Sequence, residues 1–392
     1  MSGKKKYCFV SNYLTPHQLP FCLAMVKKPD VQFIFIETEK LPEERIKLGY
    51  PVLGEKYDFV LNAKNSDEAY ASALDIVNES DVVIIGSAPD KFIKARLKEN
   101  KLTFRFSERI FKKRYHDPLR WIKYTLKNYK YRTKNLYYLL SSAYAAHDYK
   151  RCGVKTDKMF KWGYFPKTHK ERVCIERCKN SCLWIGRFLD WKHADDAIDA
   201  IIRLNREGYN VKLDLIGTGE REESLKQLVI INNAERYVNF LGSKPNEEVF
   251  EHMCRSEIFL FTSDYNEGWG AVLNEAMDSG LAVVASHAAG SVPFMVKHGE
   301  NGLIYRSGDN ESLCESLKTL LSDEELKSKL SKNAFDALNS EWNAENAVDK
   351  LICFCNSFFD GDIENGICES GVLSRAQAIP QKKMYKMIVK GE

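Results

Sequence analysis

The stretch from Ile258 to Ser286, IFLFTSDYNEGWGAVLNEAMDSGLAVVAS, indicates most clearly how this chain folds. It opens with a continuous apolar run of the kind that a fully buried parallel strand shows. Turn-forming residues follow, then a helical pattern from about Gly270 to Asp278 and a second apolar run. The stretch therefore predicts a strand, a loop, a helix and a strand, with Glu267 and Glu275 at the loop-to-helix junction. In an open α/β sheet, ligands bind at such junctions.

The same alternation of short apolar runs and helical patterns occupies most of the 392 residues. It restarts at a predicted strand over 182–186, after a polar and charged segment that has no obvious core, 167–181. A chain of this length favours two domains over one. We therefore predict an α/β protein with two Rossmann-like domains, each a parallel sheet covered on both faces. The predicted divisions are two domains, a helix and a loose tail, at 1–170, 171–343, 344–360 and 361–392.

The composition excludes several classes of protein. No apolar run is long enough for a membrane-spanning helix, and the run after the basic start is too short for a signal peptide. We therefore expect a cytoplasmic protein, either free or peripheral on the cytoplasmic face of a membrane. The eleven cysteines are scattered and are expected to be reduced. Cys174, Cys178 and Cys182 have a spacing that fits no zinc site, and no Asp-x-Asp motif occurs in the two predicted domains, 1–343, so no metal or other cofactor is expected.

Charged residues and glycines gather where predicted strands of the second domain end. Arg187 and Lys192 follow the strand over 182–186, Gly217 and Gly219 follow the strand over 211–216, and Glu267 follows the strand over 258–262. Because parallel strands end at the same edge of a sheet, these loops are expected to line one crevice. Two cations and the unpaired N–H groups of a helix start suit a diphosphate.

The spacing of the two glutamates indicates what kind of ligand they bind. Eight residues in a helical conformation span about 12 Å at 1.5 Å per residue. That length matches the separation between a hexose hydroxyl and the ribose hydroxyls of a nucleoside-diphosphate sugar. A carboxylate accepts hydrogen bonds from vicinal hydroxyls and is a poor neighbour for phosphate. Glu267 and Glu275 are therefore predicted to bind the two ends of such a donor.

Several spaced motifs resemble the retaining glycosyltransferases of family 4, within the glycosyl transferases group 1 proteins. The resemblance covers about 182–322, and the passage Gly290 to Leu303 also follows the family pattern. The motifs are G-R-x4-K-H (186–193), L-x-L-I-G-T-G-E (213–220), V-x-F-L-G (238–242) and E-G-x-G-x3-N-E-A-M-x-x-G-x-x-V-V-A-S (267–286). The resemblance implies the GT-B fold, in which two Rossmann-like domains face each other across a cleft. It also implies that the helix over 344–360 crosses back onto the first domain.

The resemblance assigns roles to residues of this sequence. Glu267 would face the donor sugar, Glu275 the ribose, and Arg187 with Lys192 would neutralise the diphosphate as it leaves. Contacts with sugar, phosphate and nucleobase are implied for the remaining donor-binding residues, which are Gly217, Gly219, Gly268, Trp269, Gly270, Ala271, Val272, Leu273, Ser243 and Lys244. The neutralisation agrees with the chemistry, because the site must stabilise negative charge that develops on the leaving group.

The first domain resembles the family only in outline, and its candidates remain open. His116 follows a predicted strand, where the family often has a histidine that faces the donor sugar; a surface or capping role is the alternative. Glu108 is another polar group at a strand end, and His17 lies in a loop that could line the acceptor side. The glycine pair that the family usually has in this first loop is absent.

Segment 91–134 is strongly basic. It has sixteen Lys or Arg residues against three acids, Glu99, Glu108 and Asp117, which is a net charge of +13, and aromatic residues are interleaved. This composition suits an anionic membrane surface, and a solvated basic face is the alternative. Nucleic acid is not expected, because no recognition module accompanies the charge.

The sequence thus predicts an enzyme that moves a sugar from a nucleoside-diphosphate sugar to an acceptor hydroxyl, on a glycan or a lipid-linked molecule, in polysaccharide or glycolipid assembly. Two alternatives remain: a nucleotide-sugar epimerase of the same fold, or a basic membrane- or nucleic-acid-binding protein with a vestigial cleft.

Overall fold

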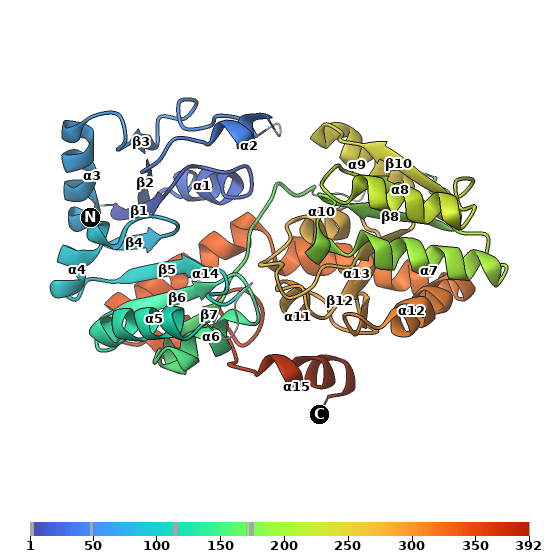
Figure 1. Ribbon diagram of the computed structural model, residues 1–392. Coiled ribbons are helices and arrows are strands. Elements are labelled where there is room, and N and C mark those ends of the chain that lie inside the picture. Colours follow the sequence, from blue (N-terminus) through green and yellow to red (C-terminus); the bar gives the residue numbers. More distant parts are fainter. Residues whose placement is uncertain (1–3, 48–49, 113–116, 170, 172–175, 392) are drawn as a thin grey trace. The chain divides into compact units, whose positions relative to one another are not determined.

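A computed structural model describes residues 4–47, 50–112, 117–169, 171 and 176–391 (Figure 1). The chain divides into two compact units, each built on its own parallel sheet. Unit 1 comprises Met1–Lys167 and Asn343–Ile379, and unit 2 comprises Thr168–Trp342 and Pro380–Glu392. In the part of the chain that is described, no helix combines the length and apolarity needed to cross a bilayer.

Unit 1 has a seven-stranded sheet in the order β3-β2-β1-β4-β5-β6-β7. Its strands are β1 (Lys5–Ser11), β2 (Val31–Glu37), β3 (Val60–Asn62), β4 (Val82–Ile85), β5 (Thr103–Ser107), β6 (Leu136–Leu140) and β7 (Met159–Lys161). Its α-helices are α1 (Leu19–Val26), α2 (Glu43–Lys47), α3 (Asp67–Glu79), α4 (Lys94–Lys98), α5 (Pro118–Tyr131), α6 (Ala145–Arg151) and α14 (Ala344–Phe359). Successive residues of β4 and β6 are all buried, so both faces of this sheet are covered.

Helix α14 packs within unit 1, although it directly follows α13 (Glu324–Glu341) of unit 2 in the chain. Its Phe354 ring lies 5.5 Å from the ring of Phe104 on β5 and 5.2 Å from that of Phe160 on β7, measured between centroids. Lys5 on β1 also donates a hydrogen bond of 2.8 Å to the side chain of Asn356. Aromatic packing therefore attaches this helix to the first sheet.

The residues after α14 are packed, whereas the sequence predicts a loose tail. Val372 and Leu373 are fully buried. The N–H of Lys161 donates to the carbonyl of Ser374 at 2.8 Å, and the N–H of Leu373 donates to the carbonyl of Lys161 at 2.9 Å. An edge strand such as β7 exposes unpaired backbone groups, and this segment pairs with them. The apolar residues lack a period because an extended, irregular segment carries them.

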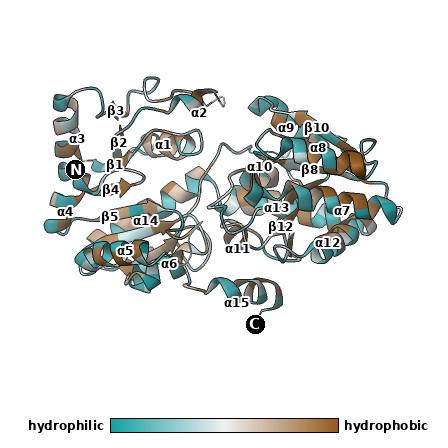
Figure 2. Cartoon of the chain, in the orientation of Figure 1, coloured by the Kyte–Doolittle hydropathy of each residue, from teal (hydrophilic) through white to brown (hydrophobic). Residues whose placement is uncertain are grey.

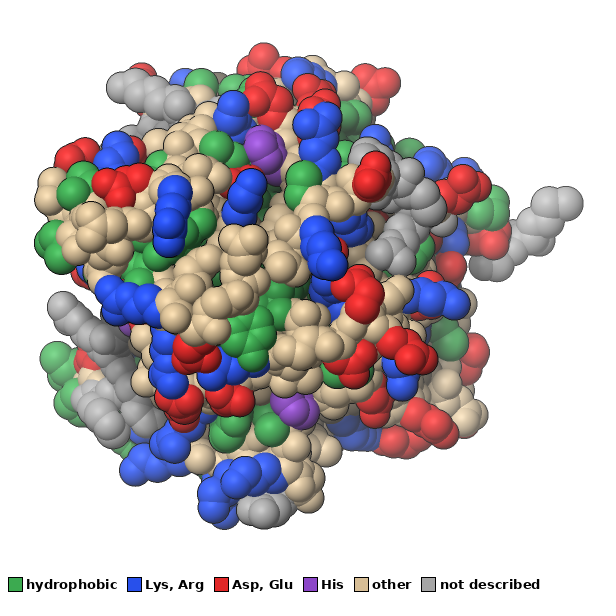
Figure 3. All heavy atoms as spheres, turned by 90° about the vertical axis from the view of Figure 1, so that its right-hand side faces the viewer, with side chains coloured by type: hydrophobic (Ala, Val, Ile, Leu, Met, Phe, Trp, Pro, Cys, Tyr) green, Lys and Arg blue, Asp and Glu red, His purple; other side chains and the backbone are tan. Residues whose placement is uncertain are grey.

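Unit 2 has a six-stranded sheet in the order β10-β9-β8-β11-β12-β13. Its strands are β8 (Ser181–Ile185), β9 (Lys212–Ile216), β10 (Val238–Gly242), β11 (Ile258–Phe261), β12 (Ala282–Ser286) and β13 (Leu303–Tyr305). Its α-helices are α7 (Ala194–Arg206), α8 (Glu222–Ile231), α9 (Asn246–Arg255), α10 (Val272–Asp278), α11 (Val292–Met295), α12 (Asn310–Ser322), α13 (Glu324–Glu341) and α15 (Gln381–Tyr385). Helices such as α7 are apolar on one side and polar on the other (Figure 2). On the face of this unit that Figure 3 shows, basic and acidic side chains are intermixed.

The predicted strand, loop, helix and strand over 258–286 are confirmed as β11, a loop, α10 and β12. Helix α10 begins at Val272, two residues later than predicted. Only its first turn therefore separates Glu275 from the loop, and the length of about 12 Å expected for eight helical residues does not apply. Gly270 takes a left-handed conformation (φ 82°), which ends the loop before the helix starts.

Candidate functional site in the second unit

The strand order of unit 2 creates a topological switch point between β8 and β11. These two strands are neighbours, and the chain runs outward from them in opposite directions along the sheet. At such a point the loops at the carboxyl ends of the two strands diverge and leave a crevice for a ligand. The loop after β8 contains Arg187 and Lys192, and the loop after β11 contains Glu267. The sheet thus brings these three predicted residues to one place.

Lys192 and Glu267 form an ion pair between these two loops. Their side chains are 17% and 14% exposed, so both are partly withdrawn from water. The hydroxyl of Ser263 donates a second hydrogen bond to the same carboxylate oxygen, at 3.2 Å. Sequence reasoning missed Ser263, although it lies four residues before Glu267 in the same loop.

The backbone of Lys192 is held by side chains of the sheet. The indole N–H of Trp184 on β8 donates to the hydroxyl of Thr262 at 2.9 Å, and that hydroxyl donates to the carbonyl of Lys192 at 2.6 Å. The N–H of Asp264 also donates to the carbonyl of Trp191 at 2.9 Å. Contacts from both sides of the switch point therefore fix the backbone position from which the Lys192 side chain extends.

Arg187 is exposed, and no ion pair or hydrogen bond of its side chain occurs among the described residues. Glu275 is only partly exposed, and its carboxylate likewise has no partner there. Burial and, to a lesser extent, the nearby charge of Asp278 together raise the pKa of Glu275 to about 7. Asp278 itself accepts hydrogen bonds from the backbone N–H of His169, at 3.0 Å, and from its ring. Within the described residues of unit 2, one cation and one acceptor of the predicted site thus have no side-chain partner.

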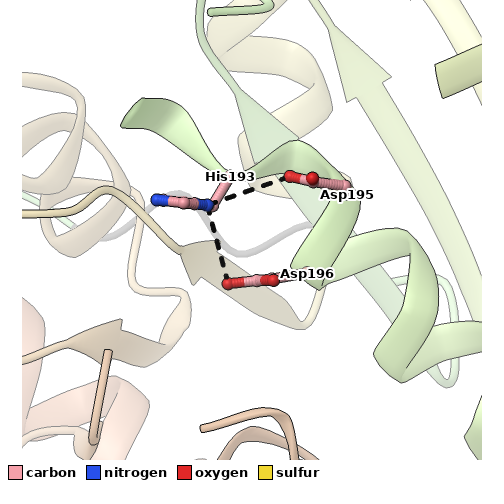
Figure 4. Close-up of side chains that lie close together, drawn as sticks. All are labelled: His193, Asp195 and Asp196. Carbon is pink, nitrogen blue, oxygen red and sulfur yellow. Dashed lines mark ion pairs between the residues drawn. The ribbon is translucent and has the colours of Figure 1, made fainter. Parts of the chain in front are cut away.

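His193 lies between acidic side chains, next to Lys192 in the sequence (Figure 4). Its Nδ1 is 4.0 Å from Asp195 and 4.0 Å from Asp196, and its Nε2 is 3.5 Å from Asp264. The hydrogen bond to Asp264 raises the pKa of His193, and the three carboxylates add to that effect against the opposing effect of burial. The ligand atoms of His193, Asp195 and Asp196 lie within 4.8 Å of one another, which is close enough to hold a metal ion. Because a proton and a metal ion compete for the imidazole nitrogens, the raised pKa of His193 disfavours metal binding at this cluster.

Close packing within the protein explains three glycines of the predicted donor site. A Cβ on Gly217 would lie 1.9 Å from the carbonyl oxygen of Gly186, and one on Gly219 would lie 2.5 Å from that of Phe188. The loop after β9 therefore runs directly against the loop after β8. At Gly270, a Cβ would lie 2.3 Å from the ring of Phe261. Close packing of the protein with itself explains these glycines without a ligand.

The segment from Gly268 to Leu273 presents backbone to the crevice and turns its large side chains inward. The indole of Trp269 is buried and donates to Asn274 at 2.9 Å, and Leu273 is fully buried. The carbonyl of Trp269 accepts a hydrogen bond of 2.6 Å from Ser291. The N–H groups of Gly270, Ala271 and Val272 have no acceptor within the described ranges. Any contact of Trp269 or Leu273 with a ligand would therefore involve backbone atoms.

Ser243 and Lys244 follow β10, at the outer edge of the sheet. Ser243 is exposed, and the ammonium of Lys244 pairs with Glu248 at 2.9 Å. Because β9 and β8 separate β10 from the switch point, these two residues are not part of the Lys192–Glu267 cluster.

Two candidates of unit 1 meet at one tyrosine that sequence reasoning did not select. The hydroxyl of Tyr164 donates to the Glu108 carboxylate at 3.0 Å, and its ring lies 6.2 Å from that of His17. Glu108 also pairs with Lys112, and burial lowers the pKa of His17. The signal was present, since Tyr164 lies in the Gly-Tyr-Phe-Pro turn that resembles the family. His116 lies outside the described residues.

A sequence profile of the glycosyl transferases group 1 family matches residues 168–337. These residues form a glycosyl transferases group 1 domain. The domain contains the strands β8 to β13 and the candidate site residues of unit 2. The predicted resemblance to group 1 proteins is thereby confirmed for this part of the chain.

Curated relatives resemble about half of the chain. An N-acetyl-alpha-D-glucosaminyl L-malate synthase of Bacillus anthracis is 28% identical over 179 residues, which are 46% of this chain and 46% of that protein. The capsular polysaccharide biosynthesis glycosyltransferase CapM of Staphylococcus aureus is 25% identical over 182 residues, 45% of each chain. The chain thus spans about half the length of the curated relatives that it matches.

Solved structures resemble the whole fold. HepE of Anabaena, in complex with UDP and glucose, has a TM-score of 0.64 at 15% identity, over 90% of this chain and all of that one. The pneumococcal O-GlcNAc transferase GtfA, in complex with UDP and GlcNAc, has a TM-score of 0.66 at 11% identity, over 91% of this chain and all of that one. At these identities the likeness concerns the fold, and it confirms the predicted GT-B class with its two parallel-sheet domains.

Proposed function

We propose that this protein is a glycosyltransferase that moves a sugar from a nucleoside-diphosphate sugar to an acceptor hydroxyl. The observation that carries the proposal is the Lys192–Glu267 pair at the switch point of the group 1 domain. Arg187 and Glu275, which have no side-chain partner among the described residues, lie on elements of the same unit. A crevice with cations and acceptors of this kind suits a ligand that carries both phosphates and hydroxyls.

The reaction breaks the bond between the anomeric carbon of the sugar and the diphosphate, which leaves with the bonding electrons. The acceptor oxygen forms a new bond to that carbon, and its hydroxyl proton is released. Arg187 and Lys192 stabilise the negative charge that develops on the diphosphate, together with the free N–H groups at Gly270 to Val272. Glu267 accepts a hydrogen bond from the sugar, and Glu275 accepts from the ribose hydroxyls.

The proposal extends to the finer features that the resemblance implies. These are membership of family 4, retention of the anomeric configuration and catalysis without a metal ion. The acceptor is a glycan or a lipid-linked molecule, in polysaccharide or glycolipid assembly, and the group around Glu108, His17 and Tyr164 lies on the acceptor side. UDP-sugars are the first donors to test, because the HepE and GtfA structures are complexes with UDP.

A donor screen tests the proposal. The unfolding temperature of the full chain is measured with a panel of UDP-, GDP- and ADP-sugars, with the free diphosphates as controls. Release of nucleoside diphosphate from each donor is measured in separate samples of folded protein. We expect one donor to raise the unfolding temperature and to be turned over. An absence of both effects across the panel contradicts a transferase. An altered sugar still joined to its nucleotide would instead identify an epimerase.

A further inference from the structure

Helix α5 of unit 1 turns its apolar side chains toward solvent. Leu119 and Leu126 are 77% and 68% exposed, and Ile122 and Tyr129 are also exposed. These four residues, which we call the outer stripe, are separated by three, four and three positions. That spacing places them on one face of a helix. The ribbon of α5 accordingly changes between hydrophobic and hydrophilic residues along its length (Figure 2).

The opposite face of α5 packs against the protein through polar contacts. Asn128 is 4% exposed, and its side-chain oxygen accepts a hydrogen bond of 3.1 Å from the hydroxyl of Tyr138 on β6. The indole N–H of Trp121 donates to the carbonyl of Arg151 on α6 at 2.9 Å. These contacts fix the rotation of the helix about its axis. The outer stripe is therefore held facing solvent, whereas the apolar face of a surface helix usually packs inward.

Basic side chains accompany the outer stripe. Lys123 and Lys130 are exposed, and helical geometry places both beside the stripe. The guanidinium of Arg132 lies 4.2 Å from the centre of the Tyr129 ring. From Pro118 to Tyr131 the helix has no acidic residue. An exposed apolar stripe flanked by cations is the pattern of helices that lie in the interface of an anionic membrane.

We propose that α5 docks this protein on an anionic lipid surface. The outer stripe enters the boundary between head groups and acyl chains, and Lys123 and Lys130 contact lipid phosphates. A second copy of the chain fits this surface poorly, because two such faces would bring like charges together. The proposal concerns α5 alone and does not depend on the transferase activity of the other unit.

Binding to vesicles tests the apolar part of the proposal. The full chain is sedimented with phosphatidylcholine vesicles that contain either no or about 30% phosphatidylglycerol. We expect it to bind only the anionic vesicles, and L119Q/L126Q to bind them at least tenfold more weakly. The matched control is Ile231→Gln at the end of α8, where the replaced side chain is 75% exposed. We expect this variant to bind like the unchanged protein. Circular dichroism confirms that all three proteins are folded.

Charge reversal tests the basic part. We expect K123E/K130E to abolish binding, whereas K329E/K332E on α13, with the same change in charge, retains most of it. Binding of the unchanged protein should also weaken as salt is raised. The proposal is overturned if the unchanged protein ignores anionic vesicles or if L119Q/L126Q binds them normally. It is equally overturned if the free protein forms a dimer that the L119Q/L126Q substitutions dissociate. It is also overturned if single-stranded RNA displaces the protein from vesicles and this displacement requires only Lys123 and Lys130.

Discussion

The Lys192–Glu267 ion pair is the contact on which the proposed chemistry depends most. Because both side chains are largely shielded from water, their charges interact more strongly than those of a surface pair. A cation held in this way needs little reorganisation when a diphosphate leaves. We predict that Lys192→Ala lowers kcat about 10²- to 10³-fold, which is the typical effect of removing one charge-stabilising group. Release of nucleoside diphosphate at saturating donor measures it.

Lys226→Ala is the control for that variant. Lys226 lies on α8, and its ammonium pairs with Glu222 at 2.7 Å on the protein surface. The Lys226→Ala substitution removes the same kind of charge from the same unit, but from a surface pair. The kcat should therefore stay within about twofold of the unchanged protein. A Lys192→Ala enzyme that is as active as this control would remove Lys192 from the mechanism.

The raised pKa of Glu275 leads us to predict that stability depends on pH. Its pKa in the folded protein is raised to about 7 by burial and by Asp278, above its ordinary value of 4.5. The folded state therefore binds a proton more tightly than the unfolded state, and the free energy of unfolding falls as the pH rises from about 4.5 to 7. We predict that Glu275→Gln raises the unfolding temperature of the ligand-free protein at pH 8 and has little effect at pH 4.5.

The same variant separates stability from binding. An amide has no negative charge and one acceptor oxygen where a carboxylate has two, so Glu275→Gln should also weaken donor binding at pH 8. Glu325→Gln, at an exposed position on α13, should change neither property. If Glu275→Gln destabilises the protein at pH 8, burial of its charge is not the cause of the raised pKa.

At the scale of elements, the contact between the loops after β8 and β9 shapes the crevice. Gly217 has a φ of 142°, and a Cβ there would overlap the carbonyl oxygen of Gly186. We predict that Gly217→Ala costs about 3 kcal/mol or more of stability, since it combines strain with a backbone clash. Gly208→Ala should cost only about 1 kcal/mol, because Gly208 is also left-handed but has open space around it. Denaturant unfolding of both variants provides the comparison.

Strands and loop positions were the elements that the sequence predicted best. Buried parallel strands are continuous apolar runs, so β4, β8, β11 and β12 could be recognised directly. Helix α5 was not predicted, because its apolar residues face solvent and its buried residues are polar. The packing of 372–376 on β7 was also missed, since an irregular segment that pairs with a sheet edge has no period. Periodicity reports burial only where one face of a regular element is covered.

The candidate site was predictable in its members and less so in its contacts. Arg187, Lys192, Glu267 and Glu275 were selected because charges at strand ends share an edge of the sheet. Nothing in the sequence could show that Lys192 pairs with Glu267, since 75 positions separate them. The interaction of Tyr164 with Glu108 was likewise hidden, because it depends on how a turn folds over the end of β5.

At the scale of the whole molecule, the chain returns to unit 1 after completing the sheet of unit 2, and the returning segment has two parts. Helix α14 packs on the sheet, whereas 372–376 pairs with the edge of β7. Such pairing protects the amides of an edge strand from exchange with water. We predict that a chain ended after Asp360 exchanges the amide hydrogens of β7 at least tenfold faster. The N–H of Lys161 should change most, because it loses its acceptor on Ser374. A chain ended after Ile379 keeps this pairing and should protect β7 like the full chain. Equal exchange in the two shortened chains would show that the segment from 361 to 379 does not stabilise the sheet edge.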